Sequence, residues 1–180
     1  MLCSIIAARN GCEVFLFEKN EKLGKKLYIT GKGRCNVTNN CEVEELLRAV
    51  MTNSKFLYSA FYTFNSQDMM ALLEETGVPL KTERGNRVFP QSDRSSDIIR
   101  GLERLMKKYG VHVRFRSEVR EILTKDGTAT GISLADGEVQ NADAVVVATG
   151  GLSYPTTGST GDGYRFARAV SYTHLTLPTN

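Results

Sequence analysis

Two apolar runs, set far apart in the chain, constrain its fold more than any other feature. Residues 13–19 (EVFLFEK) predict a buried strand that ends in the acid Glu18. Residues 144–151 (AVVVATGG) predict a second buried strand that breaks into two glycines. Continuous runs of Val, Leu and Phe are typical of strands covered on both faces, as in parallel sheets. The chain is therefore expected to fold in the α/β class.

A cationic, glycine-rich stretch lies between these two runs. Residues 31–39 (GKGRCNVTN) place Lys32 between Gly31 and Gly33, a pattern that indicates backbone brought close to a ligand. An acid at one strand end, glycines at another and this loop between them suit a dinucleotide with a large planar head group.

The remaining segments carry clear helical and strand periodicities. Apolar spacing predicts helices over residues 1–11, 42–51, 66–76 and 97–108. A further helix, capped by Asn53 or Ser54, is expected between the second and third of these. From Val111 the period shifts to two, and turns at 125–127 and 135–137 predict an antiparallel three-stranded meander over 119–140.

Four motifs together resemble one family of flavoproteins. They are residues 18–27, 30–39, 87–90 (RVFP) and 153–164 (SYPTTGSTGDGY). The chain is similar, from residue 1 to about 170, to NAD(P)/FAD-dependent oxidoreductases of the aminoacetone oxidase-like and bile-acid dehydroxylation reductase-like kind. The resemblance implies a Rossmann-like FAD-binding domain over 1–170, with a mainly helical segment at 41–110 and the β-meander within 111–142. It also implies FAD as cofactor, a small organic substrate and NAD(P)H as a candidate co-substrate for hydride transfer.

Both ends of the chain depart from the resembled pattern. In a βαβ unit, a strand and a G-x-G-x-x-G loop precede a helix such as 1–11. We therefore expect the first strand and this loop to be missing, the alternative being a short chain that begins with a surface helix. Residues 171–180 lack Asp, Glu, Lys and Arg and are expected to be a non-native tail, with a natural divergent tail as the alternative. The isolated polypeptide is then expected to be inactive and to bind FAD poorly or not at all.

The strand-end acid and the cations that follow it form the first part of the predicted site. Glu18 would accept hydrogen bonds from ribose hydroxyls, unless it is simply a solvated acid. Six cations within residues 19–34, Lys19 and Lys25 among them, would cover a pyrophosphate, although a solvated basic face is the commoner origin of such runs. Neither Gly-Lys pair has a glycine five residues earlier, so the P-loop pattern fails and nucleoside triphosphate hydrolysis is not expected.

The resemblance assigns the second part of the site to the glycine loop and to later backbone. Lys32 or Arg34 would stabilise reduced flavin, and Asn36 would bond its ring or ribityl chain. Cys35 is either redox-active or a small packing residue, and packing is favoured. Backbone at Val119 would meet adenine. The predicted cofactor-binding residues are Glu18, Lys19, Lys25, Gly31, Lys32, Gly33, Arg34, Cys35, Asn36, Val119, Thr149, Gly150 and Gly151.

Composition narrows the remaining classes of function. The net charge of +3 is mild, no apolar run reaches membrane-spanning length, and the four cysteines form no CxxC pair. A cytoplasmic protein without membrane or nucleic-acid partners is expected, with no metal site and no identified catalytic acid or base, and with its oligomeric state open. One alternative is a non-catalytic nucleotide- or RNA-binding module that uses the basic loop 19–34, where only Tyr28 offers an aromatic ring for base stacking. The other is a dehydrogenase that uses NAD alone.

Overall fold

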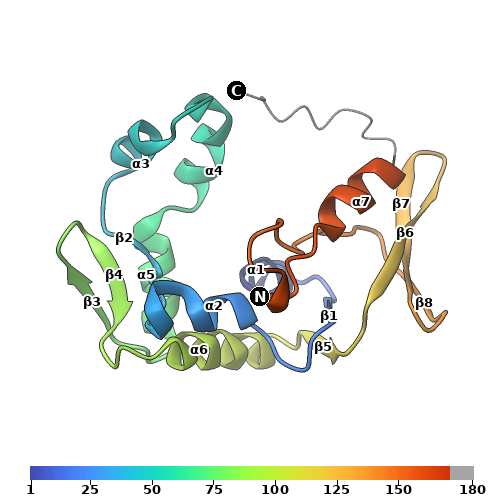
Figure 1. Cartoon of the computed structure of the whole chain (residues 1–180), viewed down its shortest axis with the longest axis horizontal. Coiled ribbons are helices and arrows are strands. Elements are labelled where there is room, and N and C mark those ends of the chain that lie inside the picture. Colours follow the sequence, from blue (N-terminus) through green and yellow to red (C-terminus); the bar gives the residue numbers. More distant parts are fainter. Residues whose placement is uncertain (171–180) are drawn as a thin grey trace. The chain divides into compact units, whose positions relative to one another are not determined.

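The computed structural model describes residues 1–170, whose contacts divide into two compact units (Figure 1). One unit comprises Met1–Val14 and Leu27–Val111. The other comprises Phe15–Lys26 and His112–Asn180, of which residues 112–170 are described. The boundary falls inside helix α2 (Lys25–Ile29). The tail expected at 171–180 lies outside the described residues.

The first unit is mainly helical and carries a small antiparallel sheet. Its elements are α1 (Leu2–Arg9), η1 (Thr30–Gly33), β2 (Thr38–Asn39), α3 (Val43–Ala49), η2 (Ser54–Leu57), α4 (Tyr58–Thr63), α5 (Ser66–Glu75), β3 (Leu80–Glu83), β4 (Arg87–Pro90) and α6 (Ser95–Lys108). The four predicted helices are thus confirmed as α1, α3, α5 and α6. The sheet, in the order β2-β4-β3, was not predicted because its strands are too short to show a period.

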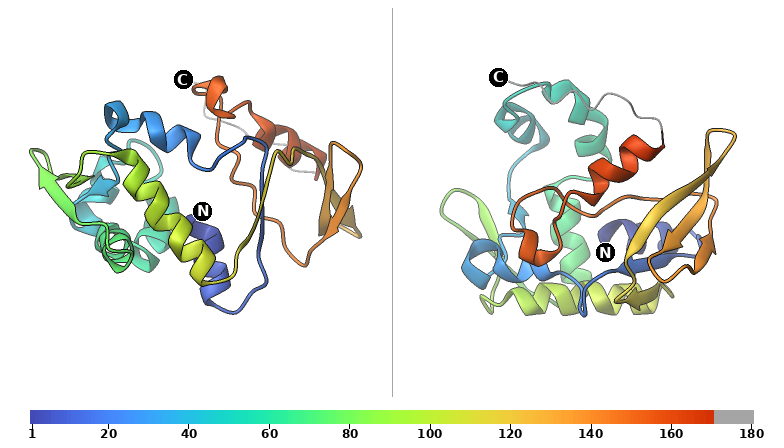
Figure 2. Two further views of the ribbon diagram at one scale, coloured as in Figure 1. Left: turned by 90° about the horizontal axis from the view of Figure 1, so that it is seen from below. Right: turned by 45° about the vertical axis from the view of Figure 1, so that its right-hand side comes forward.

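Helix α6 forms the centre of this unit. Its buried apolar side chains are Ile98, Ile99, Leu102, Leu105 and Met106, at the i, i+1, i+4, i+7 and i+8 spacing of one helical face. Helices α1 and α5 and strand β4 contact it. In the left view of Figure 2, α1 (blue) lies beside α6 (yellow-green). The helix ends where Gly110 adopts a φ of +73°, and the amide of Val111 donates back to the carbonyl of Met106 at 2.9 Å.

The start of α5 is fixed by a capping box, whereas the predicted cap of the preceding helix is absent. The Asn65 side chain accepts hydrogen bonds from the amides of Gln67 and Asp68, and the Asp68 carboxylate accepts one from the amide of Asn65. The helix expected after residue 53 is present as η2 and α4. Its capping prediction was wrong, because Asn53 is left-handed with a φ of +51° and its side chain makes no capping hydrogen bond.

The second unit combines a parallel strand pair with an antiparallel meander. Its elements are β1 (Phe15–Glu18), β5 (His112–Phe115), β6 (Val119–Lys125), β7 (Thr128–Leu134), β8 (Val139–Asn141), η3 (Pro155–Thr157) and α7 (Asp162–Ala169). Strands β1 and β5 pair in parallel from Phe15 opposite His112 to Glu18 opposite Phe115. The sheet β6-β7-β8 confirms the predicted meander, and α7 packs along β6 (Figure 1). Parallel pairing together with the meander confirms the Rossmann-like α/β class.

The predicted strand at 144–148 was wrong, and the first strand is less buried than expected. Residues 142–152 have no strand structure, and Val146 and Val147 are 67% and 43% exposed. A strand needs a neighbour to satisfy its backbone groups, and no strand within residues 1–170 pairs with this segment. Phe15 in β1 is 38% exposed for a similar reason, because the parallel sheet has only two strands among the described residues.

None of the helices within residues 1–170 combines the length and the apolar character that crossing a bilayer requires.

Candidate functional site

The carboxyl end of β1 presents a half-satisfied carboxylate. Glu18 Oε1 accepts hydrogen bonds from the amide of Asn20 at 2.9 Å and from its Nδ2 at 2.7 Å. The amide of Ser117 donates to the Glu18 carbonyl, and that of Arg116 to the Asn20 carbonyl, each at 3.0 Å. The turn after β1 is therefore held to the end of β5. Glu18 Oε2 accepts no hydrogen bond from any described residue and remains available to a ligand hydroxyl.

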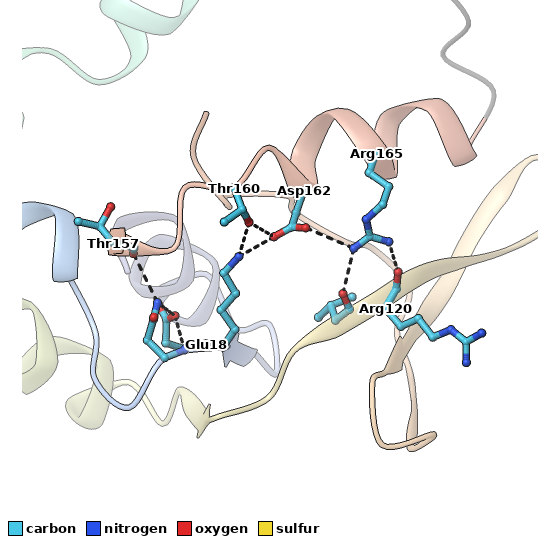
Figure 3. A network of polar contacts seen from close by, with 9 residues as sticks. Glu18, Arg120, Thr157, Thr160, Asp162 and Arg165 are labelled. Atoms are coloured by element: carbon cyan, nitrogen blue, oxygen red, sulfur yellow. Dashed lines mark hydrogen bonds and ion pairs between the residues drawn. The ribbon is translucent and has the colours of Figure 1, made fainter. Parts of the chain in front are cut away.

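Lys19, the next residue, is already paired. Its Nζ donates to Asp162 Oδ2 at 2.7 Å and to Thr160 Oγ1 at 2.6 Å, as Figure 3 shows. Thr160 Oγ1 also lies 2.9 Å from Asp162 Oδ2. The Lys19 hydrogen bond lowers the pKa of Asp162, and bonds from Thr160 and Arg165 act in the same direction. The cation expected to meet a pyrophosphate is thus neutralised by Asp162.

Arg165 ties helix α7 to strand β6. Its guanidinium donates to the carbonyls of Arg120 and Val119, the latter at 3.4 Å, and to the carboxylate of Asp162 (Figure 3). The Val119 carbonyl, part of the backbone that the resemblance assigned to adenine, therefore already accepts a protein donor. Asn20 and Arg165 were missed as site residues. Asn20 could have been found as an amide side chain two residues after the strand-end acid Glu18. Arg165 could have been found as an arginine three residues after Asp162 on the same helix.

The segment after 148 contains an unpaired buried hydroxyl beside a glycine. Thr149 Oγ1 is buried and has no hydrogen-bond partner within the described residues. Gly150 adopts a φ of +75°, and a Cβ atom there would lie 2.8 Å from Ser159 Oγ. A Cβ at Gly163 would lie 3.1 Å from Thr149 Oγ1. A buried hydroxyl without a partner is costly, so this atom suits a ligand that brings acceptor oxygens, as a dinucleotide does.

Two further cations of the basic run, Lys25 and Lys26, also have partners. Lys25 Nζ donates to Asn20 Oδ1 and to Glu21 Oε2, both at 3.2 Å. Lys26 Nζ donates to the carbonyl of Ser153 at 3.0 Å and lies 4.6 Å from the centre of the Tyr154 ring. Several of the cations in residues 19–26 are therefore already bonded to protein oxygens and do not form a free basic surface.

The glycine loop, in the first unit, has an unusual backbone. Gly31 and Lys32 both have a φ of +56°, Gly33 has +86° and Cys35 has +62°. A Cβ atom at Gly31 would lie 3.0 Å from the amide nitrogen of Asn36 and 3.1 Å from the Phe89 ring, whereas one at Gly33 would make only an ordinary contact, 3.8 Å from the Tyr28 carbonyl oxygen. Gly31 is thus required by packing inside the protein, and Gly33 by its left-handed conformation alone.

Arg34 is fully engaged within this unit. Its guanidinium makes two hydrogen bonds to the Glu83 carboxylate, at 2.9 and 3.1 Å, and one to Asp93 at 3.1 Å. It also lies 4.0 Å from the centre of the Phe89 ring. The bond to Glu83 raises the pKa of Arg34 and lowers that of Glu83. Lys81 completes the cluster by donating to Asp93 at 2.6 Å.

Residues near Arg34 in the loop differ in burial, since Cys35 is buried whereas Lys32 and Asn36 are exposed. Cys35 is 1% exposed, as the packing interpretation predicts, and burial raises the pKa of its thiol. Asn36 and Lys32 are exposed. Lys32 forms no hydrogen bond or ion pair with any described residue. The predicted site residues thus fall in both units: Gly31–Asn36 in the first, and Glu18, Lys19, Lys25, Val119 and Thr149–Gly151 in the second.

Comparison with known proteins identifies relatives over nearly the whole chain. A protein-family model described as "HI0933-like protein Rossmann domain" matches residues 1–177. The chain is 29% identical over 175 residues to the 3-dehydro-bile acid delta(4,6)-reductase of Clostridium scindens, covering 96% of the chain and 42% of that protein. It is 32% identical over 167 residues to the ribosomal RNA dihydrouridine synthase of Escherichia coli K12, covering 93% of the chain and 40% of that protein. The chain therefore spans about two fifths of the length of these relatives.

Solved structures show a similar fold at low sequence identity. Mycobacterium smegmatis Sdh1 superposes with a TM-score of 0.68 at 19% identity, covering 94% of this chain and 36% of the other. The 3-ketosteroid-delta4-(5alpha)-dehydrogenase of Rhodococcus jostii RHA1 superposes with a TM-score of 0.64 at 18% identity, covering 84% and 43%. At this identity the likeness extends to the fold alone.

Proposed function

Because the chain belongs to the HI0933-like family of Rossmann-domain proteins, we propose that it is the flavin-binding part of an FAD-dependent oxidoreductase. The proposal rests chiefly on Thr149, whose buried and unpaired hydroxyl adjoins Gly150. Glu18 Oε2, at the end of β1, is the complementary acceptor for a ribose hydroxyl.

The substrate class follows from chemistry that the two named relatives share. A delta(4,6)-reductase of a 3-dehydro bile acid saturates carbon–carbon double bonds conjugated with a ketone. Dihydrouridine differs from uridine by two hydrogens across a double bond that is likewise conjugated with a carbonyl. We therefore propose a substrate with a carbonyl-conjugated double bond. We further propose NAD(P)H as the reductant, as the resemblance in the sequence motifs implies. Bound FAD would carry the hydride between them.

The residues of the second unit would bind and orient the cofactor. Thr149 Oγ1 would donate to a phosphate oxygen, and Glu18 Oε2 would accept from the ribose. Lys19 would contact phosphate only after its ammonium leaves Asp162, 2.7 Å away. Binding is therefore expected to be weak, because an ion pair must be broken first.

The RNA-binding alternative has less support. It requires residues 19–34 to present free cations to phosphates, yet Lys19, Lys26 and Arg34 are each held by protein oxygens. RNA binding would have to break these contacts, and that cost would offset part of the binding free energy gained from counterion release.

The first experiment is a titration of the purified chain with FAD, followed by flavin absorbance and by the thermal unfolding midpoint. We expect weak binding, with a dissociation constant larger than micromolar. The thermal unfolding midpoint of the chain should rise as the FAD concentration rises. A submicromolar constant would contradict the expected weak binding. The absence of stabilisation at millimolar FAD would overturn the proposal, and stabilisation by NAD alone would favour the NAD-dependent dehydrogenase.

Asp162→Asn tests the role of the ion pair. Removing the carboxylate charge should tighten FAD binding, because Lys19 is released and repulsion of the pyrophosphate falls. Asp143→Asn is a matched control, since Asp143 is exposed and its side chain makes no hydrogen bond or ion pair with the described residues. Equal effects of the two substitutions would show that only net charge matters.

A further inference from the structure

We propose that a small cavity beside the first turns of α6 is a binding site for a protonated phosphate group. The cavity has a volume of about 120 Å³, and every residue that lines it belongs to the first unit. The dinucleotide site was assigned to the second unit, so this inference does not depend on the proposed function. The polar lining of the cavity comes from the side chains of Ser92, Asp97, Arg100 and Arg104.

The backbone walls of the cavity are held in place by main-chain hydrogen bonds. Gly77, which follows α5, has a φ of +78°, and its amide donates to the Glu74 carbonyl at 2.9 Å. The amide of Gln91 donates to the Pro79 carbonyl at 2.9 Å, which joins the segment after β4 to the segment before β3. The volume is several times that of a water molecule but well below the roughly 300–1,000 Å³ of pockets for drug-sized ligands. It therefore suits a small ion, or one group of a larger ligand.

The cavity carries more positive than negative charge. Arg100 and Arg104 are four positions apart, so they lie on the same side of α6, where like charges repel each other. The Arg100 guanidinium donates to the carboxylate of Asp97. Arg104 donates to the Thr76 carbonyl at 2.8 Å and forms no ion pair with any of residues 1–170. One carboxylate thus compensates two guanidinium groups only in part, and an anion would supply the missing negative charge.

The two arginines also keep hydrogen-bond donors available. A guanidinium carries several N–H donors. Arg104 uses Nη2 for Thr76, and Arg100 uses Nη2 for Asp97 and Ser96, so the other nitrogens of both groups form no hydrogen bond with the described residues. Guanidinium groups match the oxygens of phosphate in geometry and form charge-assisted hydrogen bonds to them.

The carboxylate of Asp97 determines which anion fits. Hydrogen bonds from Ser92 and Arg100 lower the pKa of Asp97, so this group stays ionised and can only accept hydrogen bonds. An anion without a proton would be repelled by it, whereas an anion with a proton can donate to it. Phosphate and its monoesters carry such a proton at about pH 6, and sulfate does not. The cavity should therefore prefer phosphate to sulfate.

The test is a titration of the full chain with inorganic phosphate, sulfate and chloride at about pH 6 and matched ionic strength. Binding is followed by calorimetry and by the thermal unfolding midpoint. We expect phosphate to bind with a millimolar dissociation constant and to raise the midpoint, and sulfate to bind about tenfold more weakly. Equal effects of the three salts would overturn the proposal, because they would show a response to ionic strength alone.

Arg104→Gln removes one cation from the cavity, and Lys107→Gln is its matched control. Lys107 is an exposed cation of the same helix that does not line the cavity and has no ion-pair or hydrogen-bond partner among the described residues. Arg104→Gln should weaken phosphate binding about tenfold, since charge-assisted hydrogen bonds are lost. Lys107→Gln should weaken it by no more than about twofold. Equal weakening would assign the effect to net charge and overturn the proposed site.

Asp97→Asn tests the preference for a protonated anion. Its readout is the ratio of phosphate to sulfate affinity, which any change in overall stability leaves interpretable while the chain stays folded. An amide donates as well as accepts hydrogen bonds, so the preference for phosphate should fall about tenfold. An unchanged ratio would overturn the role of Asp97, and the Arg104→Gln comparison tests the site even if Asp97→Asn fails to fold.

Methyl phosphate, a monoester, distinguishes the two sources of the phosphate group. Binding as tight as that of inorganic phosphate, and weakened by Arg104→Gln, would support a site for the phosphoryl group of a larger ligand. Binding of inorganic phosphate alone would support a site for the free ion. Binding of neither would overturn the inference and leave the flavin proposal for the second unit untouched.

Discussion

At the scale of single residues, Thr149 and Glu18 each keep one oxygen atom without a partner among the described residues. The free-energy cost of leaving the oxygen without a hydrogen-bond partner differs between the two residues. The Thr149 hydroxyl is buried, so it has lost water without gaining a protein hydrogen bond, whereas Glu18 is only half-buried. Thr149 is therefore the sharper probe of a ligand site.

Thr149→Val is expected to separate stability from binding. Replacing an unsatisfied buried hydroxyl by a methyl group should leave the free energy of unfolding unchanged or raise it by up to about 1 kcal/mol. FAD affinity should fall about five- to tenfold, since a hydrogen bond of about 1 kcal/mol is lost. Urea unfolding and FAD titration measure the two effects.

The control is Thr157→Val in the same segment. The Thr157 hydroxyl donates to the Tyr154 carbonyl at 2.8 Å, so its loss should lower stability. A destabilising Thr149→Val substitution would show that this hydroxyl has a partner in solution.

The ion pair at Asp162 should appear in the pH dependence of stability. Its pKa is lowered in the folded chain, chiefly by the Lys19 hydrogen bond. This contribution is therefore present above the unfolded pKa of about 4 and is lost as the pH falls through the lower, folded pKa. The difference in unfolding free energy between the chain and Asp162→Asn should narrow from pH 7 to about pH 2, as measured by urea unfolding. A difference that stays constant would show that the pair does not stabilise the fold.

At the scale of the elements, α6 has a regular apolar face, but at one of its positions, Gly101, contacts with residues outside the helix determine which side chain fits. Gly101 lies inside this helix, where alanine has the higher intrinsic propensity by about 1 kcal/mol. A Cβ atom there would lie 2.6 Å from Thr76 Oγ1 and 3.0 Å from Val78 Cγ2. The Thr76 hydroxyl is itself held by the Leu73 carbonyl at 2.6 Å, so it cannot move away freely.

Gly101→Ala is therefore expected to destabilise the chain by about 1 kcal/mol or more, as overpacking outweighs helix propensity. Glu103→Ala is the control on the exposed face of the same helix and should change stability by less than about 0.5 kcal/mol. Thermal and urea unfolding measure both. A stabilising Gly101→Ala substitution would show that the contact with Thr76 relaxes easily.

At the scale of the whole molecule, the buried apolar side chains are distributed unevenly. Ile98, Ile99, Leu73 and Val88 belong to the first unit, whereas the second buries chiefly Leu23, Ile132, Leu134 and Phe166. Burial of apolar surface is the main source of stability, so the two units should differ in local stability.

Amide hydrogen exchange should show this difference. We expect α6 to exchange most slowly and β1 and β5 to exchange faster, because their two-stranded sheet has little cover within the second unit. Adding FAD should slow exchange around β1 and residues 149–162. Uniform protection of both units would contradict the expected difference in local stability. An FAD effect confined to α6 would contradict the assignment of the dinucleotide site to the second unit.

The sequence by itself determined the elements whose pattern repeats along the chain. The apolar spacing of 97–108 predicted α6, and the alternation and turns after Val111 predicted the meander, because such periods reflect local geometry that each residue helps to set. The burial of Cys35 agrees with the packing interpretation that its sequence context favoured. The family resemblance was visible in short motifs, and the comparison with known proteins confirmed it.

Only the tertiary structure decided which groups of the site are engaged. Lys32 and Arg34 look alike in sequence, but Arg34 is paired with Glu83, 49 positions away. Lys19 likewise is paired with Asp162, 143 positions away. The run at 144–148 has the composition of a strand, yet it forms none without a neighbour among the described residues. Ion pairs and strand ladders join distant segments, so their formation depends on the path of the chain in space, which local periodicity does not specify.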